Sequence, residues 1–206
     1  MLINNEKQKG IYTSYSRLPL TARPLDLVYF IFFAVHLFAS IVLDLQYLYP
    51  PQYVPRLFRL ALDSYVSMSR DPLIGGVFNL YGDGGHLIWF KTFLALEAVF
   101  QVPVFILGLR ALYSGSQRIY PLLVIYGASS ATTTLACVAV VLQTPELTPE
   151  TLKQGIACIT SEQRVLLLSS YIPFLLIAGV MSVDMALRVG NLAEKGIKAE
   201  AEEKWE

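Results

Sequence analysis

Four long stretches of hydrophobic residues alternate with polar segments along the chain. The stretches cover residues 27–48, 87–112, 119–142 and 165–187. Because the hydrocarbon core of a bilayer is about 30 Å thick, a helix that crosses it needs about 20 mainly apolar residues. All four stretches are long enough. The pattern therefore predicts an all-α protein, a bundle of four transmembrane helices.

The polar segments divide the chain into three parts. Residues 1–24 are polar and show no periodicity, which predicts an N-terminal tail. This tail lacks the apolar core and the cleavage site of a signal peptide, so we expect the first span to direct insertion. The transmembrane domain then covers residues 25–190. In residues 191–206 Ala, Glu and Lys alternate, which predicts a helical cytosolic tail that continues the fourth span.

The longest connection, about 38 residues between the first two spans, contains an amphipathic pattern. In residues 54–65, Leu57, Leu60, Ala61 and Tyr65 recur at helical spacing, with charged residues opposite. We predict a short amphipathic helix that either lies on the bilayer or caps the bundle. The connection between the second and third spans is short, which predicts an antiparallel helical hairpin.

Composition and charge agree with a membrane protein. Of the 206 residues, 54% are hydrophobic and 16% are charged, more apolar surface than a soluble domain of this size needs. The 16 basic and 16 acidic residues balance, so no overall field indicates a nucleic-acid partner. If both termini are cytosolic, ten Lys and Arg residues lie on the cytosolic side and six on the other. The positive-inside rule therefore predicts cytosolic termini.

Several motifs of catalytic and metal sites are absent from the sequence. The chain lacks the HExxH and CxxC spacings of metal sites, the Gly-rich loop of phosphate sites and the GxSxG of serine hydrolases. We therefore expect no metal and no cofactor. Cys137 lies in the middle of the third span and Cys158 in the connection that follows, so we predict two free thiols.

Glu97 is the most deeply placed carboxylate, about ten residues into the second span. An ionisable side chain in hydrocarbon costs about 2.5–3.5 kcal/mol, so it usually faces the bundle interior and has a partner. Gln101 lies one helical turn further on, and Pro103 leaves a carbonyl of the preceding turn without its helical donor. Together they predict a polar notch, in which Glu97 either only holds helices together or contacts a ligand.

Asp44 is a second candidate, near the far end of the first span. His36 precedes it by eight residues, an angular offset of about 80°, so both side chains could border one cavity. An intramembrane His can also serve only as a hydrogen bonder between helices. Asp71 stands before Pro72 in the long connection, a position that by itself indicates a turn.

Hydroxyl and aromatic residues add to this polar set in the last two spans. Residues 129–134 are small and mostly hydroxylated and include Thr133; they suit close helix packing or a pocket wall. In the fourth span Tyr171 and Phe174 flank Pro173. An interior that mixes acids, hydroxyls and aromatics suits an amphiphile with an apolar body and a polar or cationic head. Sterols and lipophilic amines fit that description.

Short motifs occur in a fixed order through all four spans. In chain order they are His36, Asp44-Leu45-Gln46 and Pro50; Asp71-Pro72-Leu73; Trp89-Phe90-Lys91-Thr92-Phe93-Leu94 with Glu97, Phe100-Gln101 and Pro103; Thr132-Thr133; and Tyr171 with Pro173. In order and spacing they resemble the EXPERA-domain membrane proteins, and within that family the sigma-2 receptor branch. The resemblance covers roughly residues 25–190.

The resemblance implies an endoplasmic-reticulum protein, often dimeric, whose cavity opens toward the membrane and binds sterols and cationic amphiphiles. It further implies that Asp44 pairs with the ammonium of the ligand and that Asp71 supports Asp44. The predicted ligand-binding residues are therefore Asp44, Asp71, Glu97, Gln101, His36, Thr133, Tyr171 and Phe174. Phe174 is a departure from the family pattern, because it stands in place of another aromatic residue of the family pocket.

Three functions are compatible with these residues. The first is a non-catalytic binder of sterols and lipophilic amines with a role in sterol and lipid homeostasis, expected to contact membrane lipids and to form a homodimer. The second is a sterol double-bond isomerase of the emopamil-binding type, in which Glu97 would protonate a carbon and another acid or His36 would accept the proton. The different depths of Asp44 and Glu97 in their spans argue against an isomerase. The third is a structural helper in which the carboxylates only lock the bundle.

Overall fold

The structure, a computed structural model, describes residues 18–82 and 84–204. Four helical segments in this part of the chain are long and apolar enough to cross a membrane: Pro24–Leu48, Gly84–Ser114, Gln117–Gln143 and Ser161–Glu203. They contain the four predicted spans, which are thereby confirmed. The described part of the chain has no strand, only an isolated bridge between Glu146 and Ile159. The protein is a multi-pass, all-α membrane protein.

The first two spans are interrupted helices. The first consists of α2 (Pro24–Val42) and a 3-10 turn, Asp44–Leu48. The second begins with a 3-10 turn, Gly84–Leu87, and continues through α5 (Ile88–Leu96), a π-helical turn (Glu97–Gln101) and α6 (Val102–Ser114). Gly115 ends α6 in the left-handed conformation, with φ 69°, which a residue without Cβ adopts at little cost.

The third and fourth spans are continuous helices. A 3-10 turn, Gln117–Ile119, leads into α7 (Tyr120–Gln143), and α9 (Ser161–Glu203) forms the fourth span. α9 begins with a capping box, because the Thr160 hydroxyl accepts the amide of Gln163 while the Gln163 side chain accepts the amide of Thr160. The helix runs on through residues 191–203, so the predicted extension of the fourth span is confirmed.

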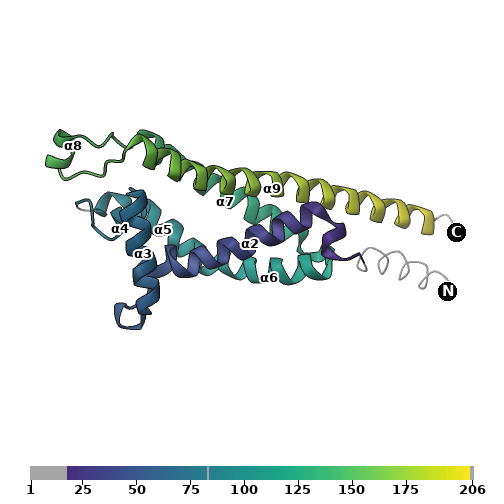
Figure 1. Ribbon diagram of the computed structural model, residues 1–206. Helices are drawn as coiled ribbons and strands as arrows, with labels where there is room; N and C mark the ends of the chain where they lie inside the picture. Colours follow the sequence, from purple (N-terminus) through teal and green to yellow (C-terminus); the bar gives the residue numbers. More distant parts are fainter. Residues whose placement is uncertain (1–17, 83, 205–206) are drawn as a thin grey trace.

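The spans form an elongated bundle in which α2 packs along α6 and α7 along α9 (Figure 1). Small residues allow both pairs to approach closely. A Cβ on Gly127 of α7 would lie 2.6 Å from the Ala178 carbonyl oxygen of α9, and one on Gly108 of α6 would lie 2.6 Å from the ring of Phe33 in α2. Close approach through small residues is typical of helix pairs in membranes.

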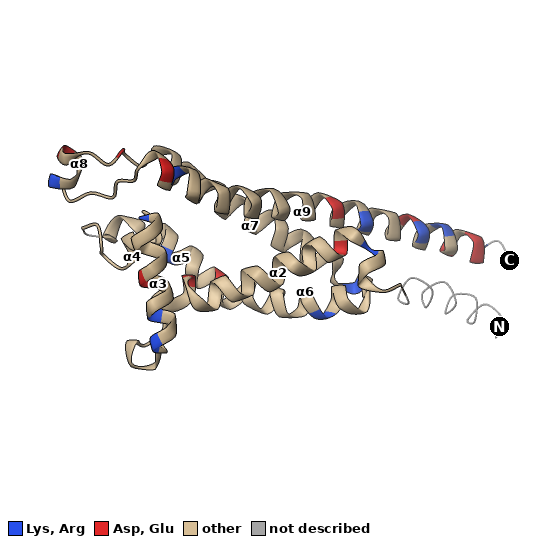
Figure 2. Ribbon diagram, in the orientation of Figure 1, with Lys and Arg blue, Asp and Glu red and all other residues tan. Residues whose placement is uncertain are grey.

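The first and last described residues lie toward one end of the bundle, which we call the terminal end (Figure 1). The opposite end, the loop end, carries α3 (Arg56–Ser69), α4 (Ile74–Val77), α8 (Pro149–Lys153) and the 3-10 turn Pro51–Tyr53. The predicted amphipathic helix is thus confirmed as α3, and it extends to Ser69. Charged residues gather toward both ends and leave a mostly uncharged middle (Figure 2).

An ion-pair network lies at the terminal end, where a further 3-10 turn, Leu20–Ala22, precedes α2. Arg188 of α9 contacts Asp184 at 2.8 Å and also Asp26 of α2 at 2.6 Å. Arg23, in the predicted tail, contacts Asp26 at 2.6 Å and donates to the Leu112 carbonyl at the end of α6 at 2.7 Å. The network therefore joins three spans.

Candidate functional site

A cavity of about 300 Å³ lies among the spans and is lined by residues of all four of them. Ligand sites in proteins typically measure about 300–1,000 Å³ and are mostly apolar with a few polar groups. Apolar walls come from Leu43, Ile74, Phe90, Phe93 and Leu94. Seven of the eight predicted ligand-binding residues line this cavity, namely His36, Asp44, Glu97, Gln101, Thr133, Tyr171 and Phe174.

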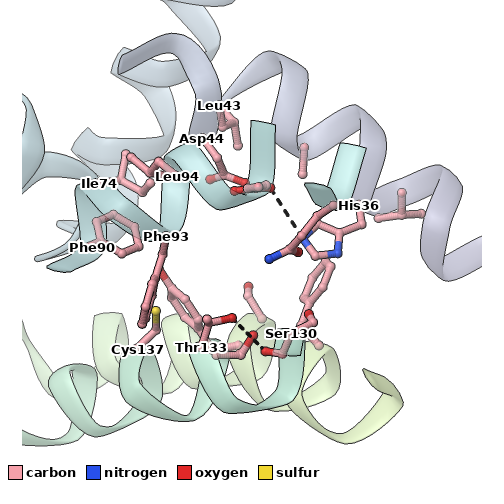
Figure 3. A pocket seen from close by; sticks show the side chains of 18 of the residues that line it. His36, Leu43, Asp44, Ile74, Phe90, Phe93, Leu94, Ser130, Thr133 and Cys137 are labelled. Carbon is pink, nitrogen blue, oxygen red and sulfur yellow. Dashed lines mark hydrogen bonds and ion pairs between the residues drawn. The ribbon is translucent and has the colours of Figure 1, made fainter. Parts of the chain in front are cut away.

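The polar groups reach the cavity from opposite sides. Figure 3 shows Asp44 on one side and Ser130 and Thr133 of α7 on the other, with His36 at one end and Phe90 and Phe93 at the other. A ligand inside would thus meet a carboxylate on one side, hydroxyls on the other and aromatic rings at both ends.

Glu97 is buried at the start of the π-helical turn. Its carboxylate accepts a hydrogen bond from the Ser40 hydroxyl of α2. The His36 Nε2 atom lies 3.8 Å from the same carboxylate oxygen, a contact that is an ion pair only when the imidazole is protonated. π-helical turns occur frequently at functional sites. Ser40 and the π turn were not anticipated, because neither leaves a distinctive local signal in the sequence.

Asp44 is the first residue of the 3-10 turn that follows α2. Within the described residues, no hydrogen bond or ion pair engages its carboxylate, although the side chain lines the cavity. Its carboxylate oxygens are therefore available to a group that enters the cavity. Glu97 lines the same cavity, although their positions in the spans led us to expect different depths. The 3-10 turn after α2 and the π turn in the second span bring the two acids to one space.

Asp71 is fully buried, with 0% of its surface exposed, and lies behind the cavity wall. One carboxylate oxygen accepts the amides of Leu73 and Ile74, at 2.8 and 3.1 Å, and so caps the start of α4. The other accepts the hydroxyls of Tyr65 at 2.6 Å and Tyr171 at 2.9 Å, and both tyrosines line the cavity. Burial and the Asp71 charge raise the pKa of Tyr65, so its hydroxyl remains a donor.

Neutral polar groups also line the cavity, Thr133 on the wall opposite Asp44 and Gln101 on the second span. The Thr133 hydroxyl donates to the carbonyls of Ser129 and Ser130 at 3.2 and 3.1 Å, which leaves its oxygen able to accept. The Gln101 side chain is 5% exposed, and no hydrogen bond to its amide group is found within residues 18–82 and 84–204. Of the two uses considered for the hydroxylated segment, the structure shows a pocket wall as well as helix packing.

His36 and Phe174 form the aromatic end of the cavity. The His36 ring lies 4.7 Å from the Phe105 ring and 4.6 Å from the Phe174 ring, measured between centroids. Its Nδ1 atom is 3.4 Å from the Tyr126 hydroxyl. The expectation that His36 and Asp44 border one cavity is confirmed. Cys137 also lines the cavity, and both cysteines are free thiols.

Among the described residues, no three or more His, Cys, Asp or Glu side chains are grouped so that they could hold a metal ion. The expectation of no metal and no cofactor remains a prediction.

Comparison with known protein families identifies the family of this chain. The family described as EXPERA (EXPanded EBP superfamily) matches residues 57–185, more than half of the sequence. The chain belongs to the EXPERA family. The matched segment contains α3 to α9 up to Met185 and includes Asp71, Glu97, Gln101, Thr133 and Tyr171. His36 and Asp44, which complete the cavity of this EXPERA protein, precede the match.

Curated relatives match a longer part of the EXPERA protein. It is 26% identical to Sigma intracellular receptor 2 of Xenopus tropicalis over 171 residues, 82% of this chain and 91% of that protein. It is 29% identical to Sigma intracellular receptor 2 of Macaca fascicularis over 169 residues, 82% and 90% of the two chains. It is also 29% identical to Sigma intracellular receptor 2 of Homo sapiens over 168 residues, which are 81% of this chain and 90% of that protein. The resemblance stated from the motifs is confirmed.

Proposed function

We propose that this EXPERA protein binds sterols and cationic amphiphiles in the cavity between its spans and acts in sterol and lipid homeostasis. The observation that carries the proposal is the Asp44 carboxylate, which lines a mostly apolar cavity without a partner among the described residues. A carboxylate within a membrane span is costly unless it is paired. An ammonium group on a lipophilic ligand supplies the missing charge, while the apolar walls accept the rest of the molecule.

The other polar groups of the cavity support a hydrogen-bonding ligand. The amide of Gln101 lines the cavity, and the oxygen of Thr133 is available on the wall that faces Asp44. A sterol hydroxyl can donate to or accept from either group. Asp71 acts indirectly in this proposal, since it holds the two tyrosines that border the cavity.

The Asp44→Asn variant tests the role of the charge. Purified protein in lipid nanodiscs is titrated with a radiolabelled lipophilic tertiary amine and, separately, with a radiolabelled sterol. We expect amine affinity to fall about 10- to 100-fold, since a charge-assisted contact is worth about 1.5–3 kcal/mol, and sterol affinity to fall less. Asp63→Asn, an exposed aspartate of α3, is the control. Unchanged binding of both ligands to folded Asp44→Asn protein would favour the structural role.

A sterol double-bond isomerase is the second candidate, because two carboxylates, Asp44 and Glu97, line one cavity. In this alternative Glu97 protonates a carbon of the double bond, and a second group, Asp44 or His36, accepts a proton from the resulting cation. Incubation of the protein with Δ8 sterols followed by product analysis decides between the candidates. Absence of turnover in protein that binds the sterol rejects the isomerase, whereas turnover lost in Glu97→Gln supports it.

The cellular setting is part of the same proposal. We place the protein in the endoplasmic-reticulum membrane as a homodimer with cytosolic termini, surrounded by lipids that supply the ligand. The relatives are named intracellular receptors, which agrees with an internal membrane. Mass spectrometry of the lipids that copurify with the protein would identify the physiological ligand class. Recovery of only bulk phospholipid, in proportion to the source membrane, would contradict a sterol ligand.

A further inference from the structure

Helix α3 has three faces of different character. At about 100° per residue, the side chains of Arg56–Ser69 fall into sectors roughly a third of a turn apart. One sector is buried against the bundle, one is exposed and apolar, and one is exposed and polar. An amphipathic helix that only caps a soluble core needs two faces, buried and wet. The third face requires a separate explanation.

The first sector faces the bundle. Leu62, Val66 and Ser69 are buried in it, and the first two belong to a core cluster with Leu73 and Phe90. Tyr65 lies in the same sector and reaches the cavity wall, where its hydroxyl donates to Asp71. This face fixes α3 to the loop end of the bundle.

The second sector is exposed and mostly apolar, with Ser64 as its one polar member among the residues of α3. Leu57, Leu60 and Met68 expose 73%, 51% and 57% of their surface. Tyr53, in the turn before the helix, exposes 77%. We call Leu57, Leu60 and Met68 the apolar face of α3. The third sector, the polar face, consists of Arg56, Arg59, Asp63 and Ser67.

The position of α3 places these faces at a membrane boundary. Figure 1 shows α3 crossing the loop end of the bundle at a steep angle to α2. α2 has 19 residues, about 28 Å at 1.5 Å per residue, so it nearly spans the hydrocarbon core before the 3-10 turn and α3 begin. Tyr47, Tyr49 and Trp89 lie at this end, and Lys91 lies over the Tyr47 ring at 5.6 Å. Tyr, Trp and basic residues concentrate at the headgroup level of membrane proteins.

We propose that the apolar face of α3 lies in the boundary between phospholipid headgroups and acyl chains, while the polar face points to water. The three sectors then meet protein, lipid and water. A helix in this position rests in the plane of the bilayer with its apolar side chains inserted. Because Tyr65 projects from the same helix into the cavity wall, the lipid contact also holds that wall in place.

Single-cysteine labelling measures the surroundings of each face. Leu57→Cys and Met68→Cys report on the apolar face, and Arg56→Cys and Asp63→Cys, about 100–140° away around the same helix, are controls on the polar face. Cys137 and Cys158 are buried, so an environment-sensitive fluorophore reacts selectively at the introduced residue, and the unsubstituted protein gives the background. Each labelled protein is placed in phosphatidylcholine nanodiscs and quenched either by shallow doxyl lipids or by aqueous iodide.

We expect doxyl lipids to quench labels at positions 57 and 68 at least about threefold more than labels at 56 and 63, and iodide to show the opposite order. Equal quenching of all four labels by iodide would overturn the proposal, since the apolar face would then be open to water. Protection of positions 57 and 68 from both quenchers, strengthened when each disc holds two copies, would overturn it in favour of a contact between copies. Thermal unfolding of each variant checks that the comparison is made on folded protein.

Discussion

Asp71 shows how a single carboxylate can organise the loop end of the bundle. Its two oxygens accept four hydrogen bonds, two from backbone amides that begin α4 and two from the hydroxyls of Tyr65 and Tyr171. The donors come from α3, α4 and α9, so one side chain fixes three elements relative to each other. Only an ionised carboxylate offers enough acceptor sites for four donors without presenting a donor of its own.

Replacing Asp71 by Asn should therefore destabilise the protein although the shape of the side chain is retained. The amide nitrogen would face either two N–H or two O–H donors, and the groups left unpaired are buried. We expect Asp71→Asn to lower the free energy of unfolding by about 1–3 kcal/mol. Thermal unfolding in detergent measures the change. Asp63→Asn, on the exposed face of α3, should shift stability by less than about 0.5 kcal/mol. Equal unfolding temperatures for the two variants would refute the organising role.

At the scale of elements, each pair of antiparallel helices is held by the same two devices. Small residues bring the helices together, and an arginine at the start of one helix binds carbonyls at the end of its partner. Arg23, before α2, donates to Leu112 at the end of α6. Arg164, in the first turn of α9, donates to the carbonyls of Val141, Leu142 and Thr144 at the end of α7. The last carbonyls of a helix otherwise lack donors, which is costly near hydrocarbon.

The α7 and α9 contact can be tested at its closest point. In Gly127→Ala the new Cβ would lie 2.6 Å from the Ala178 oxygen and 2.8 Å from the Ser182 nitrogen, backbone atoms that no rotamer change can move. We expect a loss of about 1–3 kcal/mol in unfolding free energy. Gly196→Ala, in the extension of α9 where no atom lies within 4 Å of the new Cβ, should instead gain about 0.5–1 kcal/mol. Unfolding temperatures that move in the same direction would contradict this account.

The ion network at the terminal end makes a separate prediction. Arg188→Ala leaves Asp26, which is buried, with Arg23 as its remaining ion-pair partner, and leaves Asp184 with Tyr29. Breaking a buried pair typically costs about 3–5 kcal/mol, and we expect the lower part of that range because Arg23 stays. Arg118→Ala, at an exposed position in the adjacent loop, is the control. A loss for Arg188→Ala no larger than that for Arg118→Ala would contradict the role of the buried pair.

At the scale of the whole molecule, hydropathy was enough to predict the four spans, because each span must by itself be long and apolar enough to cross the bilayer. The shared cavity of His36, Asp44, Glu97 and Gln101 followed partly from helical spacing. The contact of Tyr171 with Asp71 joins residues that are 100 positions apart, and no local pattern encodes it. The same holds for Arg23 and Leu112, 89 positions apart. Such pairs arise only once the helices are packed, so the local pattern indicated only a turn at Asp71, and the family resemblance alone made it a predicted site residue.

The distribution of basic residues between the two ends predicts the orientation of the chain in the membrane. Arg110 and Arg118 lie at the terminal end together with the basic residues of the α9 extension. At the loop end Arg59, Arg70 and Arg164 each donate to backbone carbonyls, so their presence there is explained by the fold. The distribution therefore continues to favour cytosolic termini.

A glycosylation assay reads the orientation directly. A flexible insert with an Asn-X-Thr acceptor site after Gly155, an exposed position in the connection that follows α8, should be glycosylated in microsomes if the loop end is lumenal. The expected result is an increase in mass that an endoglycosidase removes. The same insert after Lys204 should remain unmodified, because the α9 extension would lie in the cytosol. The reverse pattern would place the termini in the lumen, and the side of the membrane assigned to α3 and its polar face would change with it.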